Sequence, residues 1–293
     1  MKTVNKSISI FDPYLTRIEN TLNAALPNSN NKLHQAMRYS CLNSGKRIRP
    51  LLVYATVADL GCSPQQLDYA AAAIELIHTY SLIHDDLPTM DDDDLRRGKP
   101  SCHKQFDPAT AILAGDALNT LAFNLLTQNE CTPEIQIKLI QLLSEAAGPN
   151  QMILGQSLDL AAENQAITIE QLEQIHTAKT GALIQCSIQM AASIASASAP
   201  DQAILIQLGE TLGLTFQLQD DLLDIESSTE QLGKPIGSDQ KQHKATFPSI
   251  LGQHQTRQQL NSLYSDLQQQ LSLLSFAPTQ LSLLITSITQ RAH

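Results

Sequence analysis

The hydrophobic pattern of this chain is typical of helices. Residues 10–26 are amphipathic, whereas residues 69–84 are apolar almost all round, as in a helix buried on every side. Val occurs only at positions 4, 53 and 57, while Leu, Ala, Gln and Ile dominate, and this balance favours helix over strand. Since no stretch shows the clear alternation of a strand, we predict an all-α protein.

Proline and glycine divide this pattern into separate elements. Proline is favoured in the first turn of a helix and glycine after its end, so Pro50, Pro64 and Pro200 are expected to begin helices and Gly61 to end one. Thr168, followed three residues later by a glutamine, predicts a capping box. The expected helices cover residues 10–26, 32–43, 50–61, 64–86 and 108–127, with others after 168 and 200.

Composition narrows the class of protein. The 293 residues, 42% hydrophobic and 16% charged, fit one large globular domain over residues 1–293. A net charge of -10 argues against a general nucleic-acid binder, which is usually basic. Five scattered cysteines without CxxC spacing indicate reduced thiols rather than disulfides or a zinc site. With no signal peptide and no run of about 18 apolar residues, we expect a cytoplasmic protein without a membrane span.

The most informative stretch is residues 74–98, where an apolar helix ends in six carboxylates followed by Arg96, Arg97 and Gly98. Like charges repel, so such a cluster is costly unless a cation joins it, and Mg²⁺ prefers oxygen ligands. The two arginines suit a phosphate, which guanidinium groups bind bidentately. This order of residues predicts a site for a metal and a phosphate.

Pro88 determines how these acids are arranged. On an unbroken helix Asp91 would point away from Asp85, but an interior proline costs about 3 kcal/mol. We therefore expect the helix to stop near Asp86, so that residues 87–90 bulge and Asp91 returns beside Asp85. His78 lies two turns before Asp85 on nearly the same face. Taken alone, residues 91–94 would be a solvated acidic loop; together with these neighbours they favour the metal site.

A second acidic motif lies near position 220. Asp220 and Asp224 are four residues apart on a mostly apolar helix, Asp221 lies between them, and Gln217 is one turn earlier. Carboxylates on such a helix are expected to face something cationic.

Four other stretches each leave two interpretations open. Residues 44–50 form either an anion site at a helix start or a basic surface loop. Gln156 and Asp159 face either a cavity or solvent. The Lys179–Gly181 stretch is either kinked, presenting Lys179 and Thr180, or plain core helix. Residues 233–244 form either a lysine-bearing lid or a solvated loop. The pair His84–Asp85 also resembles that of metal phosphohydrolases, but the further ligands of that pattern are not apparent.

These residues together resemble the trans-isoprenyl diphosphate synthases, the polyprenyl synthetase family, and within it the bacterial-type farnesyl diphosphate synthases. The resemblance covers nearly the whole chain, from residues 45–50 to residues 247–248. The two aspartate motifs at this separation are its specific part, and residues 95–98 and 179–181 strengthen it. One departure is Ser44, where the family usually has glycine.

The resemblance implies an all-α, single-domain helical bundle with a central apolar cavity, commonly a homodimer. It implies a prenyl transfer in which Mg²⁺ assists ionisation of an allylic diphosphate, and isopentenyl diphosphate then attacks the cation. Several Mg²⁺ ions are expected, with Mn²⁺ as an alternative. The implied metal ligands are Asp85, Asp91 and Asp220, which with Lys179 form the catalytic set, while Asp86, Asp221 and Asp224 hold metal-bound waters. The implied allylic-diphosphate contacts are Arg96, Lys179, Thr180, Gln217, Lys234 and Lys244, and those to isopentenyl diphosphate are Lys46, Arg49, His78 and Arg97.

Tyr80 is implied to set product length, because a bulky aromatic five residues before the first aspartate blocks further growth in the family. On a helical wheel Tyr80 is roughly 140° from Asp85, so the expectation of a farnesyl product rests on resemblance. Three alternatives stay open. A geranylgeranyl diphosphate synthase is disfavoured by Tyr80. A class I terpene cyclase leaves Lys46, Arg49 and Arg97 unexplained. A non-catalytic synthase subunit is disfavoured by the two intact motifs.

Overall fold

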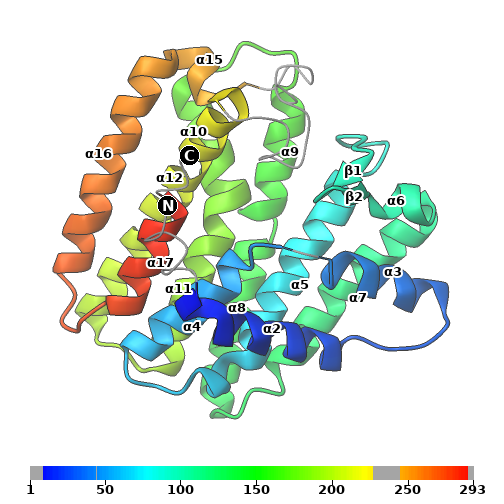
Figure 1. Ribbon diagram of the computed structural model, residues 1–293, viewed down its shortest axis with the longest axis horizontal. Helices are drawn as coiled ribbons and strands as arrows, with labels where there is room; N and C mark the ends of the chain where they lie inside the picture. The colour runs from blue at the N-terminus through cyan, green and yellow to red at the C-terminus, as the bar shows by residue number, and fades with distance from the viewer. Residues whose placement is uncertain (1–8, 44, 227–244, 290–293) are drawn as a thin grey trace.

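The computed structural model describes residues 9–43, 45–226 and 245–289, and within them it confirms the all-α prediction (Figure 1). The first half contains η1 (Ser9–Phe11), α2 (Asp12–Ala25), α3 (Lys32–Cys41), α4 (Ile48–Asp59), η2 (Pro64–Leu67), α5 (Asp68–Asp85), α6 (Cys102–Gln105) and α7 (Pro108–Leu126). The second half contains α8 (Pro133–Ala147), α9 (Met152–Ala162), α10 (Ile169–His176), η3 (Thr177–Gly181), α11 (Ala182–Ile194), α12 (Ala199–Glu226), α15 (Phe247–Leu251), α16 (Gln253–Ser272) and α17 (Thr279–Thr289).

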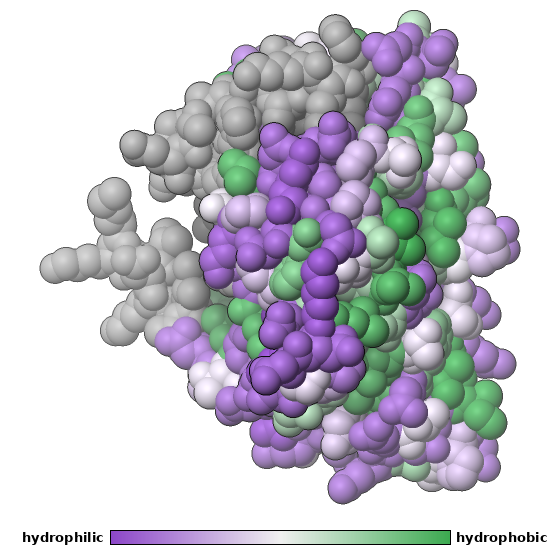
Figure 2. All heavy atoms as spheres, turned by 90° about the vertical axis from the view of Figure 1, so that its right-hand side faces the viewer, coloured by the Kyte–Doolittle hydropathy of each residue, from purple (hydrophilic) through white to green (hydrophobic). Residues whose placement is uncertain are grey.

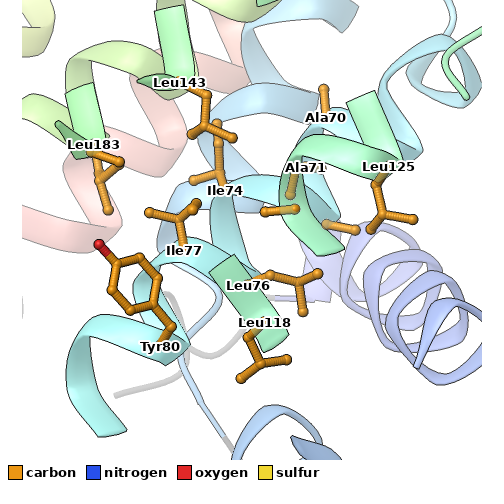
Figure 3. Packing of buried hydrophobic residues seen from close by; sticks show 14 of the residues in the cluster. Ala70, Ala71, Ile74, Leu76, Ile77, Tyr80, Leu118, Leu125, Leu143 and Leu183 are labelled. Atoms are coloured by element: carbon orange, nitrogen blue, oxygen red, sulfur yellow. The ribbon is translucent and has the colours of Figure 1, made fainter. Parts of the chain in front are cut away.

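The chain packs around α5, which runs through the middle of the bundle between α7 on one side and α4 and α11 on the other (Figure 1). Ala70, Ala73, Ile74 and Ile77 are fully buried, because neighbouring helices cover α5 on all sides. The small alanines let α7 approach closely, and larger side chains such as Leu118 fill the remaining space (Figure 3). The apolar pattern of residues 69–84 is thus explained.

Helix α10 begins with the predicted capping chemistry. Thr168 and Gln171 form the expected capping box, in which Gln171 Oε1 accepts from the Thr168 backbone N–H at 2.8 Å. Two starts differ from the prediction. The helix after the basic loop begins at Ile48, so Pro50 lies inside its first turn, and Pro64 begins the short helix η2 before α5 starts at Asp68.

A two-stranded hairpin was not predicted. Strands β1 (Leu95–Arg96) and β2 (Lys99–Pro100) pair antiparallel across a two-residue turn. Both turn residues have positive φ, 55° at Arg97 and 76° at Gly98, as a type I′ turn requires. Strands of two residues are too short to leave an alternating pattern in the sequence.

The expectation that no segment reaches the length of a membrane span was too strict, since α7 is long and apolar enough by length and composition. One such helix is weak evidence, because the core helix of a soluble protein passes the same test. Ala111, Ala114, Leu118 and Ala122 of α7 are fully buried and belong to the same hydrophobic cluster as α5.

Candidate active site

The first aspartate motif begins where α5 ends. The helix stops at Asp85, and the Asp91 backbone N–H donates to the Asp85 carbonyl oxygen at 2.9 Å. This bond closes the bulge around Pro88 and brings the two aspartates together, as expected from the position of Pro88. In Figure 1 this end of α5 lies beside β1 and β2, at the end of the bundle that α9 also reaches.

Asp85 lies in a buried, charge-rich environment. Asp85 is 6% exposed. Gln156 Nε2 donates to Asp85 Oδ1 at 2.8 Å, and Lys179 Nζ lies 3.4 Å from Asp85 Oδ2. Burial raises the pKa of the Asp85 carboxyl, Lys179 opposes this rise, and the charge of Asp91 adds to it. Both Asp85 oxygens therefore face groups from other helices, and the nearby ammonium shows that the site accommodates a cation.

Asp86 pairs with Arg96, which the hairpin holds in place. Arg96 Nε donates to Asp86 Oδ1 at 3.0 Å, Arg96 Nη2 also contacts Oδ1, and Arg96 Nη2 donates to Asp93 Oδ2 at 3.1 Å. Burial nevertheless raises the pKa of Asp86 to about 6, because Arg96 offsets only part of the desolvation. The two groups line a pocket between α3, α5 and the hairpin.

The raised pKa of Asp86 predicts a stability change with pH. Folded protein keeps this proton up to about pH 6, whereas the unfolded chain releases it near its ordinary value of 3.8. The stability from the protonated carboxyl is therefore full below about pH 4 and is lost as pH rises through 6. In EDTA, the unfolding free energy of wild type should fall as the pH is raised from 4 to 6.5. In Asp86→Asn, which cannot titrate at this position, the fall should be smaller by on the order of 2 kcal/mol. Urea unfolding at both pH values measures this; parallel losses would contradict it.

The basic residues at the start of α4 have two different roles. Arg47 is a structural residue: it has a φ of 47° and donates to Glu19 Oε1 at 2.7 Å and to Glu75 Oε1 at 2.6 Å. Arg49 has a buried Nε without a hydrogen-bond partner in the described part of the chain. Burial lowers the pKa of Arg49 to about 10, against the opposing charges of Glu75 and Asp220. A buried donor of this kind is suited to an anionic ligand.

Arg97 and His78 belong to the same basic region. Arg97 Nη2 lies 3.9 Å from Glu75 Oε1, and its guanidinium lies over Gly45, where an added Cβ would be 2.5 Å from Nη1. Burial, followed by the charges of Arg49 and Arg97, lowers the pKa of His78 well below its ordinary value, so this imidazole is neutral. The predicted residues Arg49, His78 and Arg97 are thus brought together, while Lys46 lies exposed just before α4.

The Lys179 segment is not plain core helix. Residues Thr177–Gly181 form a π-helix between α10 and α11, a widened turn that is common at functional sites. Lys179 Nζ donates to Asp159 Oδ2 at 2.8 Å, and Thr180 Oγ1 donates to Gln217 Oε1 at 3.3 Å. Burial lowers the pKa of Lys179, but Asp85 and Asp159 together raise it above its ordinary value, so the ammonium stays charged.

The second aspartate motif lies near the C-terminal end of α12. Asp220 is exposed, and Asp224 is buried. Asp221 is buried and held by two donors, since Gln217 Nε2 donates to its Oδ1 at 3.1 Å and the Phe247 N–H to its Oδ2 at 2.9 Å. The charge of Asp220 acts on Arg49, so the second motif lies near the basic region.

His84 is directed away from this site. Its Nε2 lies 3.1 Å from the Ile112 carbonyl oxygen of α7, and an added Cβ on Gly115 would overlap the ring. A structural contact with α7 therefore accounts for His84, and the metal-phosphohydrolase interpretation receives no support from it.

Tyr80 lies in the core below Asp85. It is 6% exposed, and its ring points toward Leu183 of α11 beside Ile77 (Figure 3). Burial, with a smaller contribution from the charge of Asp85, raises the pKa of Tyr80 to about 12. The ring thus forms part of the apolar region directly beneath the acidic motif.

The carboxylates of this site fit a Mg²⁺ ion that takes its remaining ligands from a bound phosphate. Within residues 9–43, 45–226 and 245–289, no three His, Cys, Asp or Glu side chains are close enough to hold a metal ion. Mg²⁺ commonly binds through one or two carboxylates together with substrate phosphates rather than in an all-protein cage. Asp85 and Asp91, which a backbone hydrogen bond joins, offer two carboxylates of this kind, and Lys179 already places a positive charge 3.4 Å from Asp85.

Two residues of this region were missed or left open by the sequence. Glu75 was not singled out, although a carboxylate within a helix that is apolar almost all round is a signal of a buried partner. Asp159 was left between cavity and solvent, and the structure directs it to Lys179. Ser44, Lys234 and Lys244, with the predicted lid, lie outside the described residues.

An all-α bundle with two aspartate motifs and a buried basic region at one end defines an isoprenoid-synthase type of protein. The chain belongs to the polyprenyl synthetase family, whose model matches residues 30–276. It is 47% identical to a farnesyl diphosphate synthase of Haemophilus influenzae over 94% of this chain and 96% of that protein. It is 38% identical to a heterodimeric geranylgeranyl pyrophosphate synthase large subunit of Arabidopsis thaliana, over 89% of this chain and 72% of that one.

A similar solved structure is a Helicobacter pylori geranyltransferase complexed with magnesium and isoprenyl diphosphate. Its TM-score is 0.87 at 33% identity, with coverage of 96% of this chain and 97% of that one. The family and the fold predicted from the sequence are confirmed.

Proposed function

We propose that this protein is a prenyltransferase that condenses isopentenyl diphosphate with dimethylallyl and then geranyl diphosphate to give farnesyl diphosphate. The observation that carries this proposal is the presence of two anion-handling regions in one site. The acidic motifs with Lys179 suit a metal-bound diphosphate, and Arg49, His78 and Arg97 suit a second one. The higher identity to a farnesyl than to a geranylgeranyl synthase supports the product length.

Asp85, Asp91 and Asp220 would hold Mg²⁺, which, when bound, neutralises charge on the leaving diphosphate. Asp86, Asp221 and Asp224 would hold metal-bound waters. The magnesium and isoprenyl diphosphate named for the Helicobacter pylori structure support this assignment. Asp221 additionally positions Gln217 and Phe247 through its two hydrogen bonds.

The remaining residues bind and orient the two substrates. Lys179, Thr180, Gln217 and Arg96 would contact the allylic diphosphate, and Lys234 and Lys244 complete the proposed set from outside the described residues. Lys46, Arg49, His78 and Arg97 would hold isopentenyl diphosphate, and neutral His78 donates a hydrogen bond without adding charge.

Binding of the two substrates by these two sets of residues would align the double bond of isopentenyl diphosphate with the allylic carbon. The allylic C–O bond breaks, the double bond attacks the resulting cation, and a proton is lost to the released diphosphate. The buried walls around Asp85 and Tyr80 exclude water, which would otherwise capture the cation.

We further propose a single domain over residues 1–293 that forms a homodimer in the cytoplasm. The family model spans most of that length, and the cysteines are all free thiols, as expected in a reducing compartment. Figure 2 shows apolar side chains on the face that carries α3, α6 and α7. On α7, Ile112 and Leu113 are 45% and 56% exposed, which supports a partner there. Sedimentation of the purified protein at micromolar concentration is expected to give twice the monomer mass; a monomer would contradict the proposal.

The test of function is incubation of purified protein with Mg²⁺, isopentenyl diphosphate and dimethylallyl diphosphate, with products measured by mass spectrometry. A farnesyl product supports the whole proposal. A longer product keeps the reaction and overturns the length assignment. No condensation beside an active control enzyme would favour a cyclase or a non-catalytic subunit.

A further inference from the structure

One face of α9 holds groups of the acidic site that belong to other helices. Gln156 donates to Asp85 at 2.8 Å, and Asp159, one turn further along, accepts from Lys179 Nζ at 2.8 Å. The same ammonium nitrogen is 3.4 Å from Asp85 Oδ2, which makes Asp159 its closer partner. The family resemblance assigns a role to Lys179 and Asp85 but none to Asp159.

The backbone of Lys179 is fixed by the same helix. Gly155 is four residues before Asp159 and thus on the same face of α9. A Cβ on Gly155 would lie 2.6 Å from Lys179 Cα, so only glycine lets α9 and the π-helix η3 meet this closely. Gly155 therefore sets where the flexible lysine side chain begins, and Asp159 sets where it ends.

We propose that Asp159 is a positioning residue that holds the Lys179 ammonium at the rim of the acidic site. A lysine side chain has four rotatable carbons, so without a second partner its ammonium would pair with Asp85 alone. Asp159 gives it a partner that remains when Asp85 takes another cation. The ammonium then stays within reach of a diphosphate bound at Asp85. This inference rests on the proposed function, since it assumes a diphosphate in this site.

The experiment is a double-mutant cycle on Asp159 and Lys179, read by calorimetric titration with inorganic pyrophosphate in the presence of Mg²⁺. We expect Asp159→Asn to weaken pyrophosphate binding about tenfold, the order of one charge-assisted hydrogen bond. In a Lys179→Met background, Asp159→Asn should cause little further loss, because Asp159 acts through Lys179. In the condensation assay it should raise the KM of the allylic substrate and leave the KM of isopentenyl diphosphate unchanged.

Glu163→Gln is the matched control, since it removes the same charge one turn further along at the end of α9 and is expected to keep wild-type binding. Asp159→Glu keeps the charge but moves the carboxylate by one methylene, and we expect an intermediate loss; it keeps the test available if Asp159→Asn does not fold. Wild-type binding by Asp159→Asn, or an undiminished loss in the Lys179→Met background, would overturn the inference. A wild-type protein that neither binds Mg²⁺-pyrophosphate nor condenses substrates would instead overturn the proposed function.

Discussion

Asp85→Asn is expected to lower kcat for farnesyl diphosphate formation about 1000-fold. The substitution keeps the size of the side chain and its ability to accept from Gln156, but it removes the charge that would hold Mg²⁺ at the leaving diphosphate. A loss of this size corresponds to about 4 kcal/mol of transition-state stabilisation, in the range expected for a metal or oxyanion interaction.

The measurement is steady-state turnover at saturating Mg²⁺ and substrate, with melting temperature as the check of folding. Since the charged form of Asp85 is disfavoured by burial, we expect Asp85→Asn to melt no lower than wild type in EDTA. Asp266→Asn serves as the matched control, because Asp266 is exposed on α16 and its variant should keep wild-type turnover. A fall of less than tenfold for Asp85→Asn would remove Asp85 from the proposed metal ligands.

Tyr80→Ala is expected to change the main product from farnesyl diphosphate to longer prenyl diphosphates. By helical rise, Tyr80 lies about 7.5 Å before Asp85 along α5. Its ring is turned toward Leu183, and its removal would extend the apolar space beneath the reacting carbon. Product chains released from wild type and variant under identical conditions can be compared by mass spectrometry.

Two features make this product test specific. Tyr80→Phe keeps the bulk of the ring and removes only the hydroxyl, so it is expected to keep the farnesyl product. Tyr80→Ala should cost about 3 kcal/mol of stability, as large core truncations do, and assays are best run well below its melting temperature. If the folded alanine variant still gave only farnesyl diphosphate, another residue would limit the product chain.

Local chemistry made much of the fold and part of the site predictable from the sequence. The end of α5 and the return of Asp91 to Asp85 followed from Pro88, because proline acts on its own backbone neighbours. The capping box at Thr168 followed from two residues in the same turn. Both predictions needed only interactions within a few residues.

Features that depend on distant segments were not predictable in this way. The Arg47–Glu75 pair joins residues 28 positions apart, and the Lys179–Asp159 bond joins residues 20 positions apart. Their formation depends on how α2, α4, α5 and α9 pack, which no pattern of spacing in one sequence specifies. Composition indicated that Lys179–Gly181 weakens the helix, but not that the result is a π-helix.

The π-helix at Thr177–Gly181 limits how this protein can be made more stable. Its hydrogen bonds span one more residue than those of an α-helix, and deleting one residue there would restore regular i to i−4 hydrogen bonding from α10 into α11. That change would also rotate the following helix by about 100° relative to the preceding one, since each helical residue advances by that angle. Lys179 would leave Gly155 and Asp159, so a more regular backbone would come at the expense of the substrate site. Stabilising substitutions therefore belong on the exposed faces of α8 and α16 rather than at this segment.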